Sequence, residues 1–205
     1  MSTIHLHVGQ AGNEIGGAFW KLAAAERPPK RWMFDERGRC KAVFVDTEPK
    51  VVRGVVSALG AERFHPRCTL VEQGGRGNNW AMGFNGADAS GARSVPSHGG
   101  GGGGGGGGSG GGVADAALDA LRFQWERCDW CSGIVLYHSI GGGTGSGMGS
   151  LLLQETRDAF PKHYITAAAM APFGPAAVIR TSRHTGNSNR WPFGAPRPSA
   201  HLPDG

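Results

Sequence analysis

The stretch that decides the fold is Ser139-Ile140-Gly141-Gly142-Gly143-Thr144-Gly145-Ser146-Gly147-Met148-Gly149. It follows residues 133–138, an apolar, β-branched run typical of a buried strand, and precedes residues 150–160, for which we predict a helix. A glycine turn between a strand and a helix leaves backbone N–H groups unpaired at the positive end of the helix dipole, where they can bind phosphate. Thr144 and Ser146 add hydroxyl donors. The stretch therefore predicts a phosphate-binding loop.

Two common phosphate loops do not describe this one. A Walker loop needs a lysine, and the sequence has none between Lys50 and Lys162. The strict dinucleotide pattern G-x-G-x-x-G does not fit either. The alternative is flexible low-complexity glycine, because consecutive glycines fill positions 99–108 upstream. The flanking strand and helix, with hydroxyls at fixed places, favour the phosphate loop.

A similar strand-turn-helix unit begins the chain. Residues 3–8 predict a strand, and the turn Gly9-Gln-Ala-Gly-Asn-Glu-Ile-Gly16 follows it. Ile15, Phe19 and Leu22 then recur at helical spacing and predict an amphipathic helix. A second set of backbone amides can therefore face the same ligand, although an ordinary turn before a helix would show the same pattern.

The next predicted strand, residues 41–45, runs into Asp46-Thr47-Glu48-Pro49. Two carboxylates just past the carboxyl end of a strand can hold Mg²⁺, directly or through water. Alternatively, acidic residues and proline simply favour the first turn of the helix predicted over 51–59. The pattern alone does not choose between these interpretations.

The remaining patterns complete an α/β fold. Residues 74–81 form a loop rich in glycine and asparagine, which tolerate left-handed backbone. Residues 113–128 predict a helix, and residues 164–171 predict a further strand. The repeated order of strand, glycine turn and helix predicts a Rossmann-like parallel sheet whose loops meet at the carboxyl ends of the strands.

Composition divides the chain into a folded part and two segments without a core pattern. Residues 84–112 consist mainly of Gly, Ala, Ser and Asp and predict a flexible insertion, whereas residues 180–205 predict a disordered tail. The predicted domain is therefore 1–179. Four arginines in the tail account for much of the formal charge of +5, so no nucleic-acid-binding stripe is predicted.

Cysteine usage and hydropathy indicate a soluble chain in a reducing compartment. The sequence has four cysteines, and it has neither a secretory h-region nor an apolar run long enough to span a membrane. Cys128 and Cys131 form a C-x-x-C pair, but no second pair follows, which favours free thiols over a zinc site.

Four of these segments together resemble the tubulin family. Its glycine loop Gly-Gly-Gly-Thr-Gly-Ser-Gly matches residues 141–147, and its first loop Gly-Gln-x-Gly-Asn matches residues 9–13. Its Val-Asp-x-Glu-Pro and Gly-Asn-Asn-Trp-Ala motifs match residues 45–49 and 77–81. The resemblance covers roughly residues 3 to 179, less than half of an intact tubulin. Within the family, segments 45–52 and 77–83 and the turn Pro172-Phe-Gly174 resemble delta-tubulin most.

The resemblance implies that GTP and Mg²⁺ bind where these loops meet. Asp46 and Glu48 would hold the metal, and Gln10 would contact phosphate and magnesium. The backbone around Gly77 and Asn78 would face the γ-phosphate. The glycine loop would supply further nucleotide contacts through Ser139, Gly141, Gly142, Gly143, Thr144, Gly145, Ser146 and Gly147.

Residues on the first loop are expected beside the rest of the nucleotide. Ala11 would line the nucleotide, and Asn13 and Glu14 would lie near the base and ribose. Tubulins usually carry glutamine where this chain has Glu14.

The resemblance further implies a cytoskeletal protein of the cytoplasm that acts with other tubulins in centrioles, basal bodies and microtubule organisation, without nucleic acid or membrane. In tubulins an acidic loop of the adjoining subunit activates the attacking water, and this chain lacks that loop. GTP binding without appreciable hydrolysis is therefore expected of the chain alone. Two alternatives stay open: a dinucleotide-dependent oxidoreductase, in which Asp46 would bind ribose, and an inactive truncated fragment.

Overall fold

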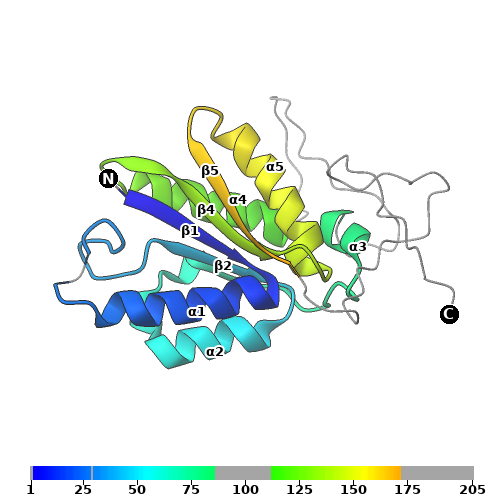
Figure 1. The fold of residues 1–205 in the computed structure, drawn as a ribbon, viewed down its shortest axis with the longest axis horizontal. Coiled ribbons are helices and arrows are strands. Elements are labelled where there is room, and N and C mark those ends of the chain that lie inside the picture. Colours follow the sequence, from blue (N-terminus) through cyan, green and yellow to red (C-terminus); the bar gives the residue numbers. More distant parts are fainter. Residues whose placement is uncertain (1, 29, 86–111, 172–205) are drawn as a thin grey trace, which may run out of the picture.

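A computed structural model describes residues 2–28, 30–85 and 112–171 of the chain (Figure 1). Five strands form one sheet in the order β3-β2-β1-β4-β5, and all neighbouring strands are parallel. The predicted parallel α/β fold class is confirmed. In chain order the elements are β1 (Ser2–Val8), α1 (Gly9–Ala25), β2 (Ala42–Asp46), α2 (Pro49–Leu59), η1 (Ala61–Arg63), η2 (Pro66–Cys68), β3 (Thr69–Val71), α3 (Trp80–Asn85), α4 (Val113–Glu126), β4 (Cys131–Ser139), η3 (Thr144–Met148), α5 (Gly149–Ala159) and β5 (Tyr164–Met170).

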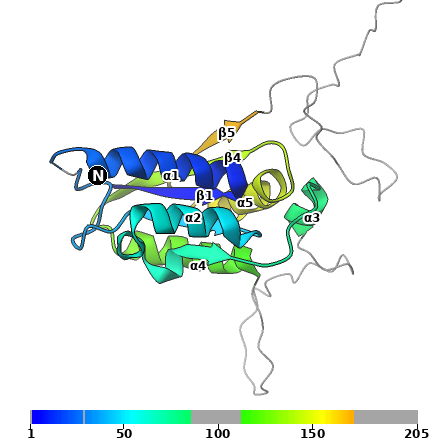
Figure 2. The same ribbon diagram turned by 90° about the horizontal axis from the view of Figure 1, so that it is seen from below.

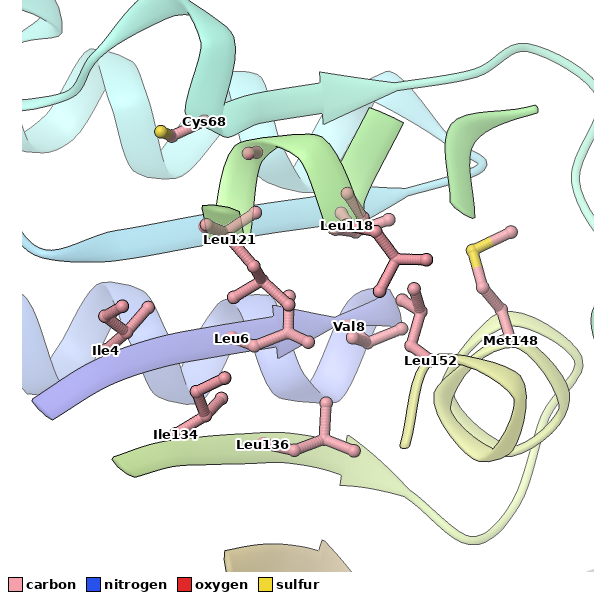
Figure 3. Packing of buried hydrophobic residues seen from close by; sticks show 14 of the residues in the cluster. Ile4, Leu6, Val8, Cys68, Leu118, Leu121, Ile134, Leu136, Met148 and Leu152 are labelled. Carbon is pink, nitrogen blue, oxygen red and sulfur yellow. The ribbon is translucent and has the colours of Figure 1, made fainter. Parts of the chain in front are cut away.

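Helices cover both faces of the sheet, with α1 and α2 on one face and α4 and α5 on the other (Figures 1 and 2). Successive side chains of a strand point to opposite faces, so the central strand β1 is buried on both sides. Ile4, Leu6 and Val8 pack in the core with Leu121 of α4 and Leu152 of α5 (Figure 3). This apolar layer packs helices α4 and α5, from the later part of the described chain, against the first strand.

The alternate residues of β1 make the opposite face partly polar. His7 is fully buried beneath α1, where its Nδ1–H donates to the Gly12 carbonyl at 3.2 Å. Its Nε2 accepts a hydrogen bond of 3.1 Å from the indole N–H of Trp20. Burial disfavours the charged imidazole and is the main reason that the pKa of His7 falls to about 3; the nearby His5 adds to this shift, and the bond to Gly12 opposes it. These bonds attach α1 to the sheet.

The residues by which α1 contacts the sheet differ from those that indicated the helix in the sequence. Ile15 and Leu22 are 38% and 72% exposed, whereas Gly12, Gly16 and Trp20 are buried. A Cβ at Gly12 would overlap the carbonyl oxygen of Tyr137. Glycine therefore brings the helix axis close to the sheet, and the close approach selects a different helix face from the one that hydrophobicity alone favours.

Two short elements were not predicted, and several boundaries move. Strand β3 lies where the sequence predicted no element, and helix α3 begins inside the predicted loop 74–81, because three and six residues give too few repeats for a periodic signal. Helical backbone begins at Thr144 rather than at residue 150, since the π-helical turn η3 runs directly into α5. Phe84 and Asn85 belong to α3, and Gly112 caps α4, so the ends of the predicted 84–112 insertion are ordered.

Three predictions of local structure concern residues outside those described. They are the rest of the Gly-rich insertion, the Pro172-Phe-Gly174 turn and the tail from residue 180. Within the described part of the chain, no helix combines the length and the apolar character needed to cross a membrane.

We predict that Gly12→Ala destabilises the fold, although alanine is the better helix former. The new methyl group would meet the Tyr137 backbone carbonyl, which cannot move without disturbing β4. We expect a loss of about 1–3 kcal/mol in the free energy of unfolding, measured by urea denaturation.

Gly54→Ala on α2 is the matched control. No atom lies within 4 Å of a Cβ at this exposed helical position. Here the gain in helix propensity acts alone and should stabilise the fold by about 0.5–1 kcal/mol. Equal effects of the two substitutions would contradict the role of Gly12 in docking α1.

Candidate phosphate-binding site

A cavity of about 560 Å³ opens at the carboxyl ends of the strands. Its walls come from the segments that follow β1, β2, β3 and β4, which converge although they are far apart in sequence. Parallel strands place all their carboxyl ends at one edge of the sheet, and this edge is where such folds bind ligands. The lining residues are Gln10, Ala11, Glu14, Asp46, Glu48, Val51, Arg76, Gly77, Asn78, Ser139, Gly141, Gly142, Gly143, Thr144 and Gly145.

The glycine segment lies at the centre of these walls and touches each of the other loops. A Cβ on Gly9 would lie 2.7 Å from the Gly145 nitrogen, and one on Gly143 would lie 2.5 Å from the Cβ of Arg76. A Cβ on Gly147 would overlap the Trp80 carbonyl of α3. The loops therefore meet backbone to backbone, and side chains at these positions would push them apart.

Hydrogen bonds hold the glycine segment in place. His138, buried at the end of β4, donates through Nδ1 to the Gly145 carbonyl at 3.0 Å. The hydroxyls of Thr144 and Thr47 are 2.5 Å apart, which joins the glycine segment to the end of β2. Ser139 Oγ accepts from the Gly141 N–H at 3.1 Å.

Two helices begin at this cavity. The first turn of α1 supplies Gln10 and Ala11, and η3, which continues into α5, supplies Thr144 and Gly145. The N–H groups of a first helical turn have no acceptor within the helix and carry partial positive charge. The cavity can therefore bind an anion through backbone groups, without a lysine.

The two predicted metal-binding carboxylates both line the cavity but have different surroundings. Asp46 is 3% exposed, and its Oδ1 accepts from the Thr47 N–H at 2.8 Å. Its Oδ2 accepts from the Asn13 amide at 3.2 Å. Burial is the main reason that the pKa of Asp46 is raised, and the adjacent Glu48 adds to the shift. A bound cation would relieve both effects.

The Glu48 carboxylate lies at the start of helix α2, where it could serve the helix instead of a metal. Glu48 occupies the N-cap position, but its side chain makes no capping hydrogen bond. The N-cap position of Glu48 and the proline in the first turn of α2 fit the helix-start alternative as well, and Asp46 bonds the turn that leads into the helix.

Three predicted site residues do not line the cavity. Asn13 is fully buried and donates to the Val45 carbonyl at 2.9 Å as well as to Asp46. Ser146 is buried and its hydroxyl donates to the Gly142 carbonyl. Gly147 packs against α3. These residues support the cavity walls from behind.

Gln10 and Glu14 lie one helical turn apart at the mouth of the cavity. The Gln10 amide donates to the Glu14 carboxylate at 3.0 Å, and both side chains are exposed. The two side chains are thus brought together as expected for neighbours on one helix face.

Sequence reasoning missed three residues that belong to this site. Val51 and Arg76 line the cavity, and Thr47 bonds Thr144. Arg76 stands between glycines in a loop already assigned to phosphate, and a cation in that setting was the available signal. Thr47, between the two carboxylates, carried no such signal.

The described residues contain no cluster of three or more His, Cys, Asp or Glu side chains suited to a metal ion. Mg²⁺ does not need one, because it keeps several waters and often binds through one or two carboxylates plus substrate phosphates. The pair Asp46 and Glu48 beside a predicted phosphate-binding loop fits that mode.

Comparison with known proteins identifies related sequences. The family model described as Tubulin/FtsZ family, GTPase domain, matches residues 2–98 and 93–190. A tubulin beta chain of Aspergillus fumigatus is 28% identical over 194 residues, covering 82% of this chain and 37% of the relative. A tubulin beta-1 chain of Hypocrea rufa is 30% identical over 190 residues, covering 83% of this chain and 38% of the relative. The chain thus spans well under half the length of these relatives.

Proposed function

We propose that this chain, which belongs to the Tubulin/FtsZ family, binds GTP in the cavity at the carboxyl ends of its strands. One observation carries the proposal. The four segments that resemble tubulin motifs are separate in the sequence, yet each contributes residues to the same cavity wall. Independent flexible glycine runs would have no reason to converge in this way.

In this proposal the phosphates lie against the glycine segment. Backbone N–H groups of Gly142 and Gly143 and of the first turns of α1 and η3 would donate to phosphate oxygens. Thr144 would add its hydroxyl, and Gln10 its amide. The side chains of Glu14 and Val51 would contact the less charged parts of the nucleotide at the cavity rim.

We assign the Mg²⁺ that accompanies a triphosphate to Asp46 and Glu48. The metal would supply positive charge that lowers the cost of holding a triphosphate beside two carboxylates. Asn13 and the Thr47 N–H hold Asp46 in place for that contact. Asn13 therefore serves as a positioning residue rather than as a ligand of the base.

The finer assignment we propose is a delta-like tubulin that acts with other tubulins at centrioles or basal bodies. Its support is the sequence of residues 45–52 and 77–83, together with Pro172-Phe-Gly174. We further propose that residues 1–179 form the nucleotide-binding domain and that residues 180–205 lie outside it.

We expect the purified chain to bind fluorescent GTP and not fluorescent NAD, which separates the proposal from the oxidoreductase alternative. Gly142→Ala should weaken GTP binding about tenfold or more, because its methyl group would stand where phosphate contacts the loop. Titration by fluorescence anisotropy measures both.

Gly38→Ala is the matched control for that substitution. Gly142 and Gly38 both have positive φ angles, of 84° and 73°, so alanine strains the backbone similarly at each. Gly38 lies away from the cavity and has no atom within 4 Å of a Cβ. GTP affinity lost equally in both variants would indicate general destabilisation, and binding of NAD in preference to GTP would refute the proposal.

Mg²⁺ should strengthen GTP binding, and Asp46→Asn combined with Glu48→Gln should abolish most of that gain. The amides keep the size of the side chains but remove the charges that attract the metal. Asp119→Asn with Glu126→Gln removes the same charge from the exposed surface of α4 and should leave the gain intact. GTP titrations with and without Mg²⁺ measure this gain in affinity. If Mg²⁺ strengthens GTP binding equally in the variant with Asp46→Asn and Glu48→Gln, the two carboxylates serve only the first turn of α2.

The delta-like assignment predicts where the chain accumulates in ciliated cells. A fluorescently tagged chain should concentrate at centrioles or basal bodies. Uniform incorporation along microtubules, as seen by microscopy beside a tagged beta-tubulin control, would contradict the assignment.

A further inference from the structure

We propose that the side chain of Arg76 binds the phosphate chain of the nucleotide, and that Glu72 holds its guanidinium until the phosphates take it over. This inference rests on the proposed nucleotide binding and names a residue to which the sequence motifs assign no role. It follows from the position, the partners and the charge of Arg76.

The position of Arg76 is fixed by the glycine segment. Arg76 lies in the loop between β3 and α3 and lines the cavity. A Cβ on Gly143 would lie 2.5 Å from the Cβ of Arg76 and 2.7 Å from its carbonyl oxygen. The base of this side chain is therefore held against the loop that we assign to phosphate.

The guanidinium has unused hydrogen-bonding capacity. The Arg76 side chain is only 3% exposed, and one terminal nitrogen of the guanidinium donates to Glu72 Oε2 at 2.6 Å. The other donates to the Gly75 carbonyl at 2.9 Å. The Nε–H is buried and has no partner among the described residues. An arginine carries five N–H donors, so these two bonds leave further donors of this lining residue unused.

Charge makes an anion the fitting partner for those donors. Arg76 is the one cationic side chain among the described residues that line the cavity, while Glu14, Asp46 and Glu48 bring negative charge. A buried guanidinium needs a counter-charge, and its planar fork matches the oxygens of phosphate.

Glu72 is suited to release the guanidinium. Its side chain is 38% exposed, so water can solvate the carboxylate when Arg76 turns away. The Arg76–Glu72 pair would thus neutralise the cavity arginine in the empty protein and compete with phosphate when nucleotide arrives. Removing either partner should therefore change nucleotide affinity, but in opposite directions.

The test compares GTP affinity in the wild-type chain and two variants by fluorescence titration with Mg²⁺ present. Arg76→Gln should weaken binding about tenfold to a hundredfold, the effect expected when one hydrogen bond to a charged group is lost. Glu72→Gln should strengthen binding several-fold, because the competing carboxylate is gone. Arg76→Lys keeps the charge without the fork and should bind with intermediate affinity.

The exposed pair Arg122 and Asp119 on α4 provides the matched control. Their ion pair of 2.8 Å resembles the Arg76–Glu72 pair, but neither residue lines the cavity. Arg122→Gln and Asp119→Asn should leave GTP affinity unchanged. Thermal unfolding without nucleotide checks that each variant is folded, and if Arg76→Gln does not fold, Arg76→Lys and Glu72→Gln carry the comparison.

The outcomes separate this inference from the proposed function. Weaker GTP binding by both Arg76→Gln and Glu72→Gln would mean that the ion pair only supports the fold. Unchanged binding by Arg76→Gln would mean that Arg76 does not reach the phosphates. Either result overturns the role of Arg76 while wild-type GTP binding stands. Absence of GTP binding by the wild-type chain overturns the proposed function itself and this inference with it.

Discussion

The close approach of three loops to one glycine segment is the constraint on which the rest of the structure depends. Gly9, the Arg76 loop and helix α3 all contact residues 143–147 at distances that leave no room for a Cβ. Each contact alone is a local packing detail. Together they bring the loops after the first four strands of the chain to one cavity, where backbone donors, hydroxyls and carboxylates can act on a single ligand.

Polar bonds in the interior connect this cavity to the sheet. His7 bonds the Gly12 carbonyl, and Asn13 bonds both the Val45 carbonyl and Asp46. These bonds fix the rotation of helix α1 about its axis and its position along the sheet, so that its first turn, with Gln10 and Ala11, reaches the cavity. A purely apolar interface would bury a similar area but would specify this placement less sharply, because apolar contacts are not directional. The buried polar residues of α1 thus serve the site as well as the fold.

The net charge of the site is the reason for proposing that both a cation and an arginine help to bind the nucleotide. The cavity is lined by carboxylates, and one of them, Asp46, has a raised pKa because it is buried beside Glu48. Backbone dipoles alone would have to overcome this negative charge when phosphate binds. A metal on the carboxylates and the positive charge of Arg76 would both offset it.

The sequence by itself determined the strand-turn-helix order and the parallel α/β class, because each depends on a local pattern, and its resemblance to tubulin motifs indicated most of the cavity lining. A glycine turn after an apolar run can be recognised in the sequence without knowing which segments contact it in space. Only the tertiary structure decided which face of α1 is buried, that Asn13 and Ser146 lie behind the cavity wall, and that Arg76 lines it. Those outcomes depend on how closely two segments far apart in the chain approach each other, and that distance is set by packing across the sheet.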